Sequence, residues 1–178
     1  MEILEGLKTR RSVRKYDDTK KIPHEDIKKM IEAACYSPSA HNMQPWEFIV
    51  VEDREALTGF RAIQPWTSFA RFASCAIIVC CDLDKAFHRE KEDEKWSFAE
   101  IDGTLAAYGI LLAAHGMGYG ACFCGAAPMP LVIDNLRKMY NLPENILPIA
   151  IIPIGVPLEE PKQVSDRYQE EKIHWEKW

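Results

Sequence analysis

Three arginines and a serine stand close together near the start of the chain, in the sequence Arg10-Arg11-Ser12-Val13-Arg14. Guanidinium groups and a hydroxyl are hydrogen-bond donors, and arginine binds phosphate oxygens through two parallel N–H bonds. Residues 8–15 contain no acidic residue, although the whole chain has a net charge of −5. A basic cluster in an acidic protein favours a site for one anionic ligand over a long nucleic-acid track. A solvated basic face is the simpler alternative.

A second polar segment, residues 37–46, reads Ser-Pro-Ser-Ala-His-Asn-Met-Gln-Pro-Trp. Its small residues allow close approach to a flat ring, and the side-chain amides of Asn42 and Gln44 can both donate and accept hydrogen bonds. This mixture matches the pyrimidine edge of a flavin. The alternative is a turn capped by its own side chains.

Other motifs that carry chemistry are missing from the sequence or stand in the wrong order. Glycines at positions 116, 118 and 120 follow an expected helix and precede an expected strand, the reverse of the dinucleotide-binding order. Cys122-Phe123-Cys124 lacks the spacing of a zinc site, and the five histidines are scattered, so no metal is expected. The sequence has neither a Gly-x-Ser-x-Gly elbow nor a Walker loop.

The sequence also limits the compartment and the partners. The longest apolar run, residues 76–81, is too short to cross a bilayer, and the first five residues do not resemble a secretory signal. We therefore expect a cytoplasmic protein with no membrane partner, whose six cysteines are free and mostly buried thiols. Its acidic net charge argues against a nucleic-acid partner.

The elements that must position these residues alternate irregularly, which indicates one α+β domain spanning residues 1–178. Helices are expected at residues 2–8, 22–37, 101–117 and 129–140. Strands are expected at residues 46–51, 73–82, 119–124 and 148–156. The charged residues 85–95 are expected to form an exposed helix or lid. Pro153 should lie at a strand edge or a bulge, because it has no N–H to donate.

Two segments offer more apolar surface than one chain of this size can cover. The helix expected at residues 101–117 is apolar nearly all round, as in a helix buried on every side. The tail, residues 157–178, carries Tyr168, Ile173, Trp175 and Trp178, too many apolar residues for a disordered end. Both features predict packing against a partner subunit.

Four ordered motifs make the chain resemble the FMN-dependent nitroreductases from end to end. The motifs are residues 10–16, residues 37–46, residues 111–120 with Gly125, and residues 166–175. The resemblance implies an intertwined homodimer of three-layer α/β/α sandwiches with a mixed, mainly antiparallel sheet. It also implies that the tail, residues 157–178, packs on the partner subunit.

The resemblance implies a role for each matching residue. Most would hold FMN at the dimer interface, with the phosphate end near the arginines and the partner subunit supplying the loop from Pro38. Backbone amides around Gly125 and Ala126 would lie near flavin N5 and O4, where hydride arrives. The implied cofactor-binding residues are Arg10, Arg11, Ser12, Arg14, Pro38, Ser39, Ala40, Asn42, Gln44, Gly125, Ala126 and Arg167.

The implied reaction is ping-pong hydride transfer from NADH or NADPH, through FMN, to small electron-poor acceptors such as nitroaromatics or quinones. Because the flavin carries the chemistry, no side chain is assigned as a catalytic acid or base. The alternative is a protein of the same fold that stores or senses FMN without turnover. Cys122 and Cys124 could be redox-active thiols or buried packing. The candidates to line the substrate cleft, with core packing as the alternative for each, are Trp66, Phe69, Phe87, Trp96 and Phe123.

Overall fold

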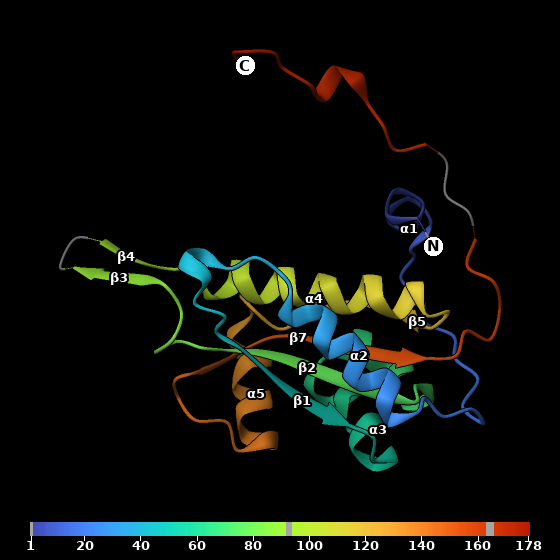
Figure 1. Ribbon diagram of the computed structural model, residues 1–178. Helices are drawn as coiled ribbons and strands as arrows, with labels where there is room; N and C mark the ends of the chain where they lie inside the picture. The colour runs from blue at the N-terminus through green and yellow to red at the C-terminus, as the bar shows by residue number, and fades with distance from the viewer. Residues whose placement is uncertain (1, 92–93, 163–165) are drawn as a thin grey trace.

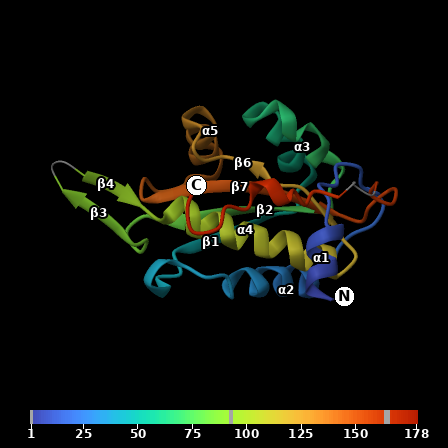
Figure 2. The same ribbon diagram turned by 90° about the horizontal axis from the view of Figure 1, so that it is seen from above.

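The computed structural model describes residues 2–91, 94–162 and 166–178 as a three-layer α+β sandwich (Figures 1 and 2). The helices are α1 (Ile3–Thr9), α2 (His24–Cys35), α3 (Arg54–Ile63), α4 (Ala99–Gly116) and α5 (Pro130–Tyr140). The strands are β1 (Trp46–Val51), β2 (Cys75–Asp82), β3 (His88–Lys91), β4 (Glu94–Ser97), β5 (Gly120–Ala121), β6 (Cys124–Gly125) and β7 (Ile146–Gly155). Short 3-10 helices cover Ala40–Asn42, Pro65–Phe72 and Glu170–Lys172. The expected α+β sandwich is confirmed.

The central sheet has the strand order β1-β2-β7-β5, with β6 also paired to β7, and all of these pairs are antiparallel. One isolated parallel bridge, Ser12 to Ala121, joins the N-terminal segment to the sheet. Alternate residues of β2 point to opposite faces, so Ile77 and Val79 pack with α2 and α4 while Ile78 packs with α3 and α5. Figure 2 shows these helix pairs on the two sides of the sheet.

Pro153 explains why the strand expected at residues 119–124 is split into β5 and β6. Cys122 donates its N–H to the carbonyl of Pro153 at 3.2 Å, but Pro153 has no N–H to return. The ladder therefore breaks opposite the proline, between Ala121 and Cys124. The prediction that Pro153 marks a strand edge is wrong, since β7 lies between β2 and β5. The register shift on β7 instead lies opposite Val79 and Cys80.

The segment expected to be a charged helix or lid is a two-stranded hairpin, β3 and β4, that extends away from the sheet (Figure 1). The helical part of that prediction is wrong. In the register of the two strands, Lys91 pairs with Glu94 and Glu90 pairs with Lys95. The base of the hairpin is aromatic: the ring centroids of Phe87 and Trp96 lie 5.5 Å apart. Cross-strand pairing of this kind outweighs the helical preference of the charged residues.

Helix α4 crosses the whole sheet and is apolar on two sides. One side packs on the sheet through residues such as Ala106 and Ile110, which are fully buried. The other side presents Ile101, Leu105 and Tyr108, which are between 38% and 54% exposed. The tail does not cover them: it leads away from the body, beyond α1 (Figure 1). Among the described residues, the chain therefore buries the side of α4 that faces the sheet and leaves the opposite apolar side partly exposed, although burial on all sides was expected.

The close packing of α4 on the sheet yields a stability prediction. A Cβ on Gly103 would lie 2.6 Å from Ile149 Cγ1 and 2.8 Å from Cys81 Sγ. We expect Gly103→Ala to destabilise the fold by about 1–3 kcal/mol through overpacking, despite alanine's better helix propensity. Gly116→Ala is the matched control, because a Cβ there meets nothing within 4 Å. Urea unfolding measures both, and equal stability of the two variants would contradict the packing argument.

Candidate functional site

The N-terminal arginines are placed by a segment that runs along the edge of the sheet. Val13 donates its N–H to the Ala121 carbonyl at 3.0 Å, beside the bridge from Ser12 to Ala121. This close approach requires a glycine, since a Cβ on Gly120 would lie 2.6 Å from Val13 Cγ1. Tyr16 holds the segment in place: its hydroxyl lies 2.7 Å from Val13 O and 3.0 Å from Pro153 O, so the two carbonyls share its one donor hydrogen. Burial raises the pKa of that phenol.

These residues line a cavity of about 460 Å³, which we call the arginine cavity. Six basic residues and two acidic residues contribute to its lining. The lining comprises Arg10, Arg11, Ser12, Val13, Arg14, Lys15, Glu159, Glu160, Pro161, Lys162 and Arg167. The excess of guanidinium donors suits an anion such as a phosphate. The structure thus brings together five of the predicted residues, including Arg167 from the tail.

The side chains of the arginine cavity differ in how far they are already engaged. One Nη of Arg11 donates to the carbonyl of Lys8, in the last turn of α1, and to that of Arg10, which follows the helix. The guanidinium of Arg14 lies 6.0 Å from the centre of the Phe69 ring. The Nε atoms of Arg10 and Arg11 are buried, and neither has a hydrogen-bond partner among the described residues. An unpaired buried donor is costly, so these two N–H groups are polar atoms that the described residues leave unsatisfied beside the cavity.

Strand β6 and the residue after it were expected to present two backbone N–H groups to a ligand, at Gly125 and Ala126, but the structure leaves only one of them pointing out of the sheet. Ala126 N–H donates to Ile149 O at 2.8 Å, so it points into the sheet. By the alternation of antiparallel hydrogen bonds, Gly125 N–H points the opposite way, toward the open edge of β6. Phe123 lies beside it, 3.4 Å from the position of a Cβ on Gly125. Of the two amides expected near a flavin, Gly125 N–H faces the open edge of β6, and Ala126 N–H is bonded within the sheet.

Gln64 is a candidate site residue that the sequence did not indicate. It is 5% exposed, and its Nε2 donates to the Gly125 carbonyl at 3.0 Å. Its Oε1 is buried and has no partner among the described residues. Gln64 therefore fixes the peptide that follows Gly125. The available signal was a lone amide between Ile63 and Pro65, which no local pattern distinguishes from a loop residue.

The loop from Pro38 to Gln44 is ordered by its own polar groups and by α4. Ala40 N–H donates to Asp102 Oδ1 at 3.0 Å, and Asp102 is only 1% exposed. Gln44 N–H donates to Ser39 Oγ at 3.0 Å, and Gln44 Nε2 donates to Asn42 Oδ1 at 2.8 Å. The capped turn allowed by the sequence is thus present. The side chains of Asn42 and Gln44 remain exposed, so they are still available to a ligand.

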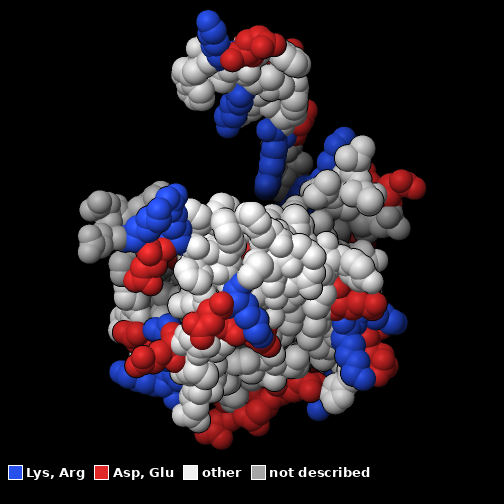
Figure 3. Space-filling view, turned by 60° about the vertical axis from the view of Figure 1, so that its left-hand side comes forward, with Lys and Arg blue, Asp and Glu red and all other residues white. Residues whose placement is uncertain are grey.

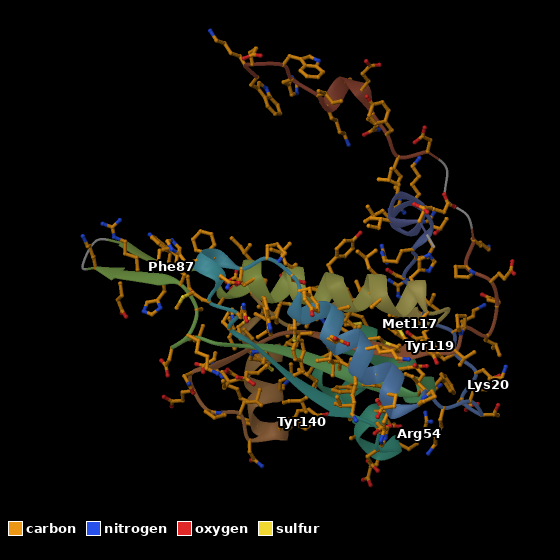
Figure 4. All side chains as sticks on the ribbon, in the orientation of Figure 1. Lys20, Arg54, Phe87, Met117, Tyr119 and Tyr140 are labelled. Atoms are coloured by element: carbon orange, nitrogen blue, oxygen red, sulfur yellow. The ribbon has the colours of Figure 1, made fainter. Side chains whose placement is uncertain are left out.

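Within one chain, this loop and the arginine cavity lie at opposite ends of α4. Asp102, in the first turns of α4, binds the loop. His115, in the last turn of α4, contacts α1: its Nε2 lies 2.8 Å from Thr9 Oγ1. His115 is thirteen helical steps after Asp102, and at the rise of an α-helix this is about 20 Å. In Figure 4, Phe87, whose ring lies near His41 of the loop, and Met117, just beyond α4, are seen toward opposite ends of the helix. A single chain therefore does not bring Pro38, Ser39, Ala40, Asn42 and Gln44 to the arginines.

The aromatic candidates for the cleft divide in the same way. Phe69 and Phe123 lie near the arginine cavity and Gly125. Phe87 and Trp96 lie at the other end, where the Phe87 ring is 4.0 Å from His41 of the loop. Trp66 is 75% exposed.

In the part of the chain that the structure describes, no group of three or more His, Cys, Asp or Glu residues could hold a metal ion. None of the described helices has the length and apolarity needed to cross a membrane.

The fold and the cavity together define an α+β sandwich with a cationic site at the edge of its sheet. The sequence matches the Nitroreductase family over residues 7–74 and 64–156, and the chain belongs to that family. A protein of Methanothermobacter thermautotrophicus named "Putative NADH dehydrogenase/NAD(P)H nitroreductase" is 40% identical over 178 residues, which is 100% of this chain and 88% of the relative.

Solved structures extend the comparison. A protein of Bacteroides thetaiotaomicron with the same name is 37% identical, with a TM-score of 0.88 over 98% of this chain and 97% of that one. An FMN-dependent nitroreductase of Clostridium difficile is 29% identical, with a TM-score of 0.86 over 99% of this chain and 100% of that one.

Proposed function

We propose that this chain is an oxidoreductase that binds FMN in the arginine cavity and uses NADH or NADPH to reduce small electron-poor acceptors, such as nitroaromatics or quinones. The arginine cavity carries the proposal: its basic residues outnumber its acidic ones, and the Nε–H groups of Arg10 and Arg11 have no acceptor among the described residues. FMN ends in a phosphate, which supplies such acceptors. The names of the two relatives, NAD(P)H nitroreductase and FMN-dependent nitroreductase, support the same assignment.

The residues present fit this cofactor. Arg10, Ser12, Arg14 and Arg167 would bind the phosphate, and the Nε–H of Arg11 would add one donor. Gly125 N–H, which faces the open sheet edge, would bind the polar edge of the ring, with its peptide oriented by Gln64. When bound, the flavin supplies hydride transfer. The chain would position the flavin and supply the positive charge that binds its phosphate. The nicotinamide and the electron acceptor would bind beside the flavin one after the other.

We also propose that the functional unit is a homodimer in which each cofactor site takes residues from both chains. The loop carrying Pro38, Ser39, Ala40, Asn42 and Gln44 would reach the site of the partner subunit, because it lies a helix length away from its own arginines. The upper part of the body in Figure 3 is largely free of charged side chains, as expected of a face that another chain covers. The exposed Trp175 and Trp178 of the tail would pack on that partner.

The purified protein should be yellow, with FMN as the chromophore released on heating. Adding NADH or NADPH without oxygen should bleach the flavin, and a quinone should then restore its colour. Absorption spectra record both steps. A flavin that binds but is not reduced would favour the storage or sensing alternative. A colourless protein that takes up no added FMN would overturn the proposal.

Loss of one phosphate ligand should weaken FMN binding without unfolding the chain. Arg14→Ala and Arg167→Ala each remove charge-assisted hydrogen bonds of about 1.5–3 kcal/mol, so the Kd should rise roughly tenfold to a hundredfold. Flavin titration measures the Kd, and circular dichroism monitors the fold. Arg61→Ala on α3, outside the cavity lining, is the matched control. Equal affinity of all three variants would contradict the phosphate assignment.

A charge on the exposed face of α4 should separate the subunits and release the cofactor together. Leu105→Glu places a carboxylate where the proposed partner packs, which disfavours burial of that surface. Leu131→Glu is the control, since Leu131 is 72% exposed on α5, in the layer across the sheet. Sedimentation at protein and flavin wavelengths measures both effects. A monomeric Leu105→Glu variant that keeps stoichiometric FMN would contradict the shared site.

A further inference from the structure

The loop from Pro38 to Gln44, which we call the Pro38 loop, has a strained backbone. His41, Asn42 and Gln44 have φ angles of 50°, 57° and 50°, in the left-handed region. Asparagine and histidine tolerate this region better than most residues, but each such conformation still costs free energy. Strain of this kind persists only where surrounding contacts impose it, and it is common at ligand sites. The loop therefore needs contacts that hold it.

Asp102 of α4 supplies such a contact at the start of the strained stretch. Its Oδ1 accepts the N–H of Ala40 at 3.0 Å, one residue before His41. Asp102 is 1% exposed, and its Oδ2 is buried with no hydrogen-bond partner among the described residues. Burying a carboxyl group with one oxygen unpaired costs free energy. Asp102 is thus a poor choice for stability alone, which favours a role in shaping the loop.

The part of α4 that carries Asp102 is a rigid support for the loop. A Cβ on the adjacent Gly103 would lie 2.6 Å from Ile149 Cγ1, so the helix is packed tightly on the sheet at this turn. Ser37, just before the loop, donates its hydroxyl to the Leu105 carbonyl at 3.2 Å, nearly one turn further along α4. The conformation of the loop is therefore referred to a helix that has little freedom to shift.

The held loop presents two side-chain amides in a fixed arrangement. Gln44 N–H donates to Ser39 Oγ at 3.0 Å, and Gln44 Nε2 donates to Asn42 Oδ1 at 2.8 Å, which orients the two amides relative to each other. Both side chains are exposed. Because the length of α4 separates them from the arginines of their own chain, any effect of Asp102 on these amides should be felt at the site of the partner subunit.

We propose that Asp102 is a positioning residue that acts across the dimer interface: by fixing Ala40, it holds Asn42 and Gln44 in the geometry that binds FMN at the arginine cavity of the partner subunit. Asp102 is buried beneath the loop and does not itself touch the cofactor. The inference rests on the proposed function, since it needs FMN in a site that both chains share.

FMN titration of three variants tests this role. Asp102→Ala removes the acceptor for Ala40 N–H and releases the strained loop, so the Kd for FMN should rise roughly tenfold or more. Asp102→Asn keeps a side-chain oxygen at the same place, and its Kd should stay within roughly threefold of the wild type. Glu100→Ala is the matched control, because it removes an exposed carboxylate from the first turn of the same helix, and it should bind as the wild type does. Circular dichroism and sedimentation monitor the fold and the dimer.

Mixed dimers then show at which site Asp102 acts. Chains with Asp102→Ala and chains with Arg14→Ala should each bind FMN weakly when measured apart. In a dimer that contains one of each, one site combines the intact arginines of the first chain with the intact loop of the second. After subunit exchange, tight binding should therefore return at roughly a quarter of all sites if the chains assort at random. A residue that only supported the fold of its own chain would give no such rescue.

Wild-type affinity of Asp102→Ala for FMN, or a mixture with no more tight sites than its two components, would overturn the inference and leave the proposed function intact. If Asp102→Ala does not fold, Asp102→Ser takes its place in both experiments, since its side chain is too short to reach Ala40 N–H. A wild-type protein that binds no FMN, or that keeps it as a monomer, would instead refute the proposed function or its shared site, and this inference with it.

Discussion

The contact on which the site depends is the backbone pairing of residues 12 and 13 with Ala121. This pairing turns the end of α1 into a segment that lies along the sheet edge, so consecutive arginines stand around one cavity instead of spreading over a helix surface. It requires close approach at Gly120, where any Cβ would collide with Val13. The same pairing holds Ser12 beside Ala121 of β5, at the wall of the cavity.

Helix α4 imposes the second constraint, because its length separates the two halves of the proposed site. Asp102 fixes the loop at one end, and His115 meets α1 at the other. Burial, together with Arg10 and Arg11 nearby, lowers the pKa of His115, which favours a neutral ring beside the cationic cavity. The outer face of α4 is apolar, and α4 runs from the Pro38 loop to the arginines. A second copy packed on this face would therefore extend along the whole distance between the two groups of site residues.

Pro153 shows how one missing donor shapes the open edge of the sheet. Because it cannot return the bond from Cys122, the ladder breaks at residues 122–123, and β6 remains a short strand with an exposed edge. Gly125 N–H faces that edge, and Gln64 holds the carbonyl of the same residue. Successive side chains of a strand point to opposite faces, which explains the orientation of residues 122–124: the ring of Phe123 faces outward and is 38% exposed, whereas Cys122 and Cys124 face the core.

The sequence alone determined the elements that a local pattern encodes. Apolar periodicity located α2, an all-round apolar run located α4, a buried run of β-branched residues located β2, and the clustered arginines predicted an anion site. Helix α3 gave no prediction, although Asp53 caps it by accepting from Ala56 N–H. Only the tertiary structure decided the β3–β4 hairpin, the break opposite Pro153, the role of Gln64 and the distance between the arginines and the Pro38 loop. Each of these depends on pairing or packing between residues far apart in the chain, and local spacing carries no record of which distant segments meet.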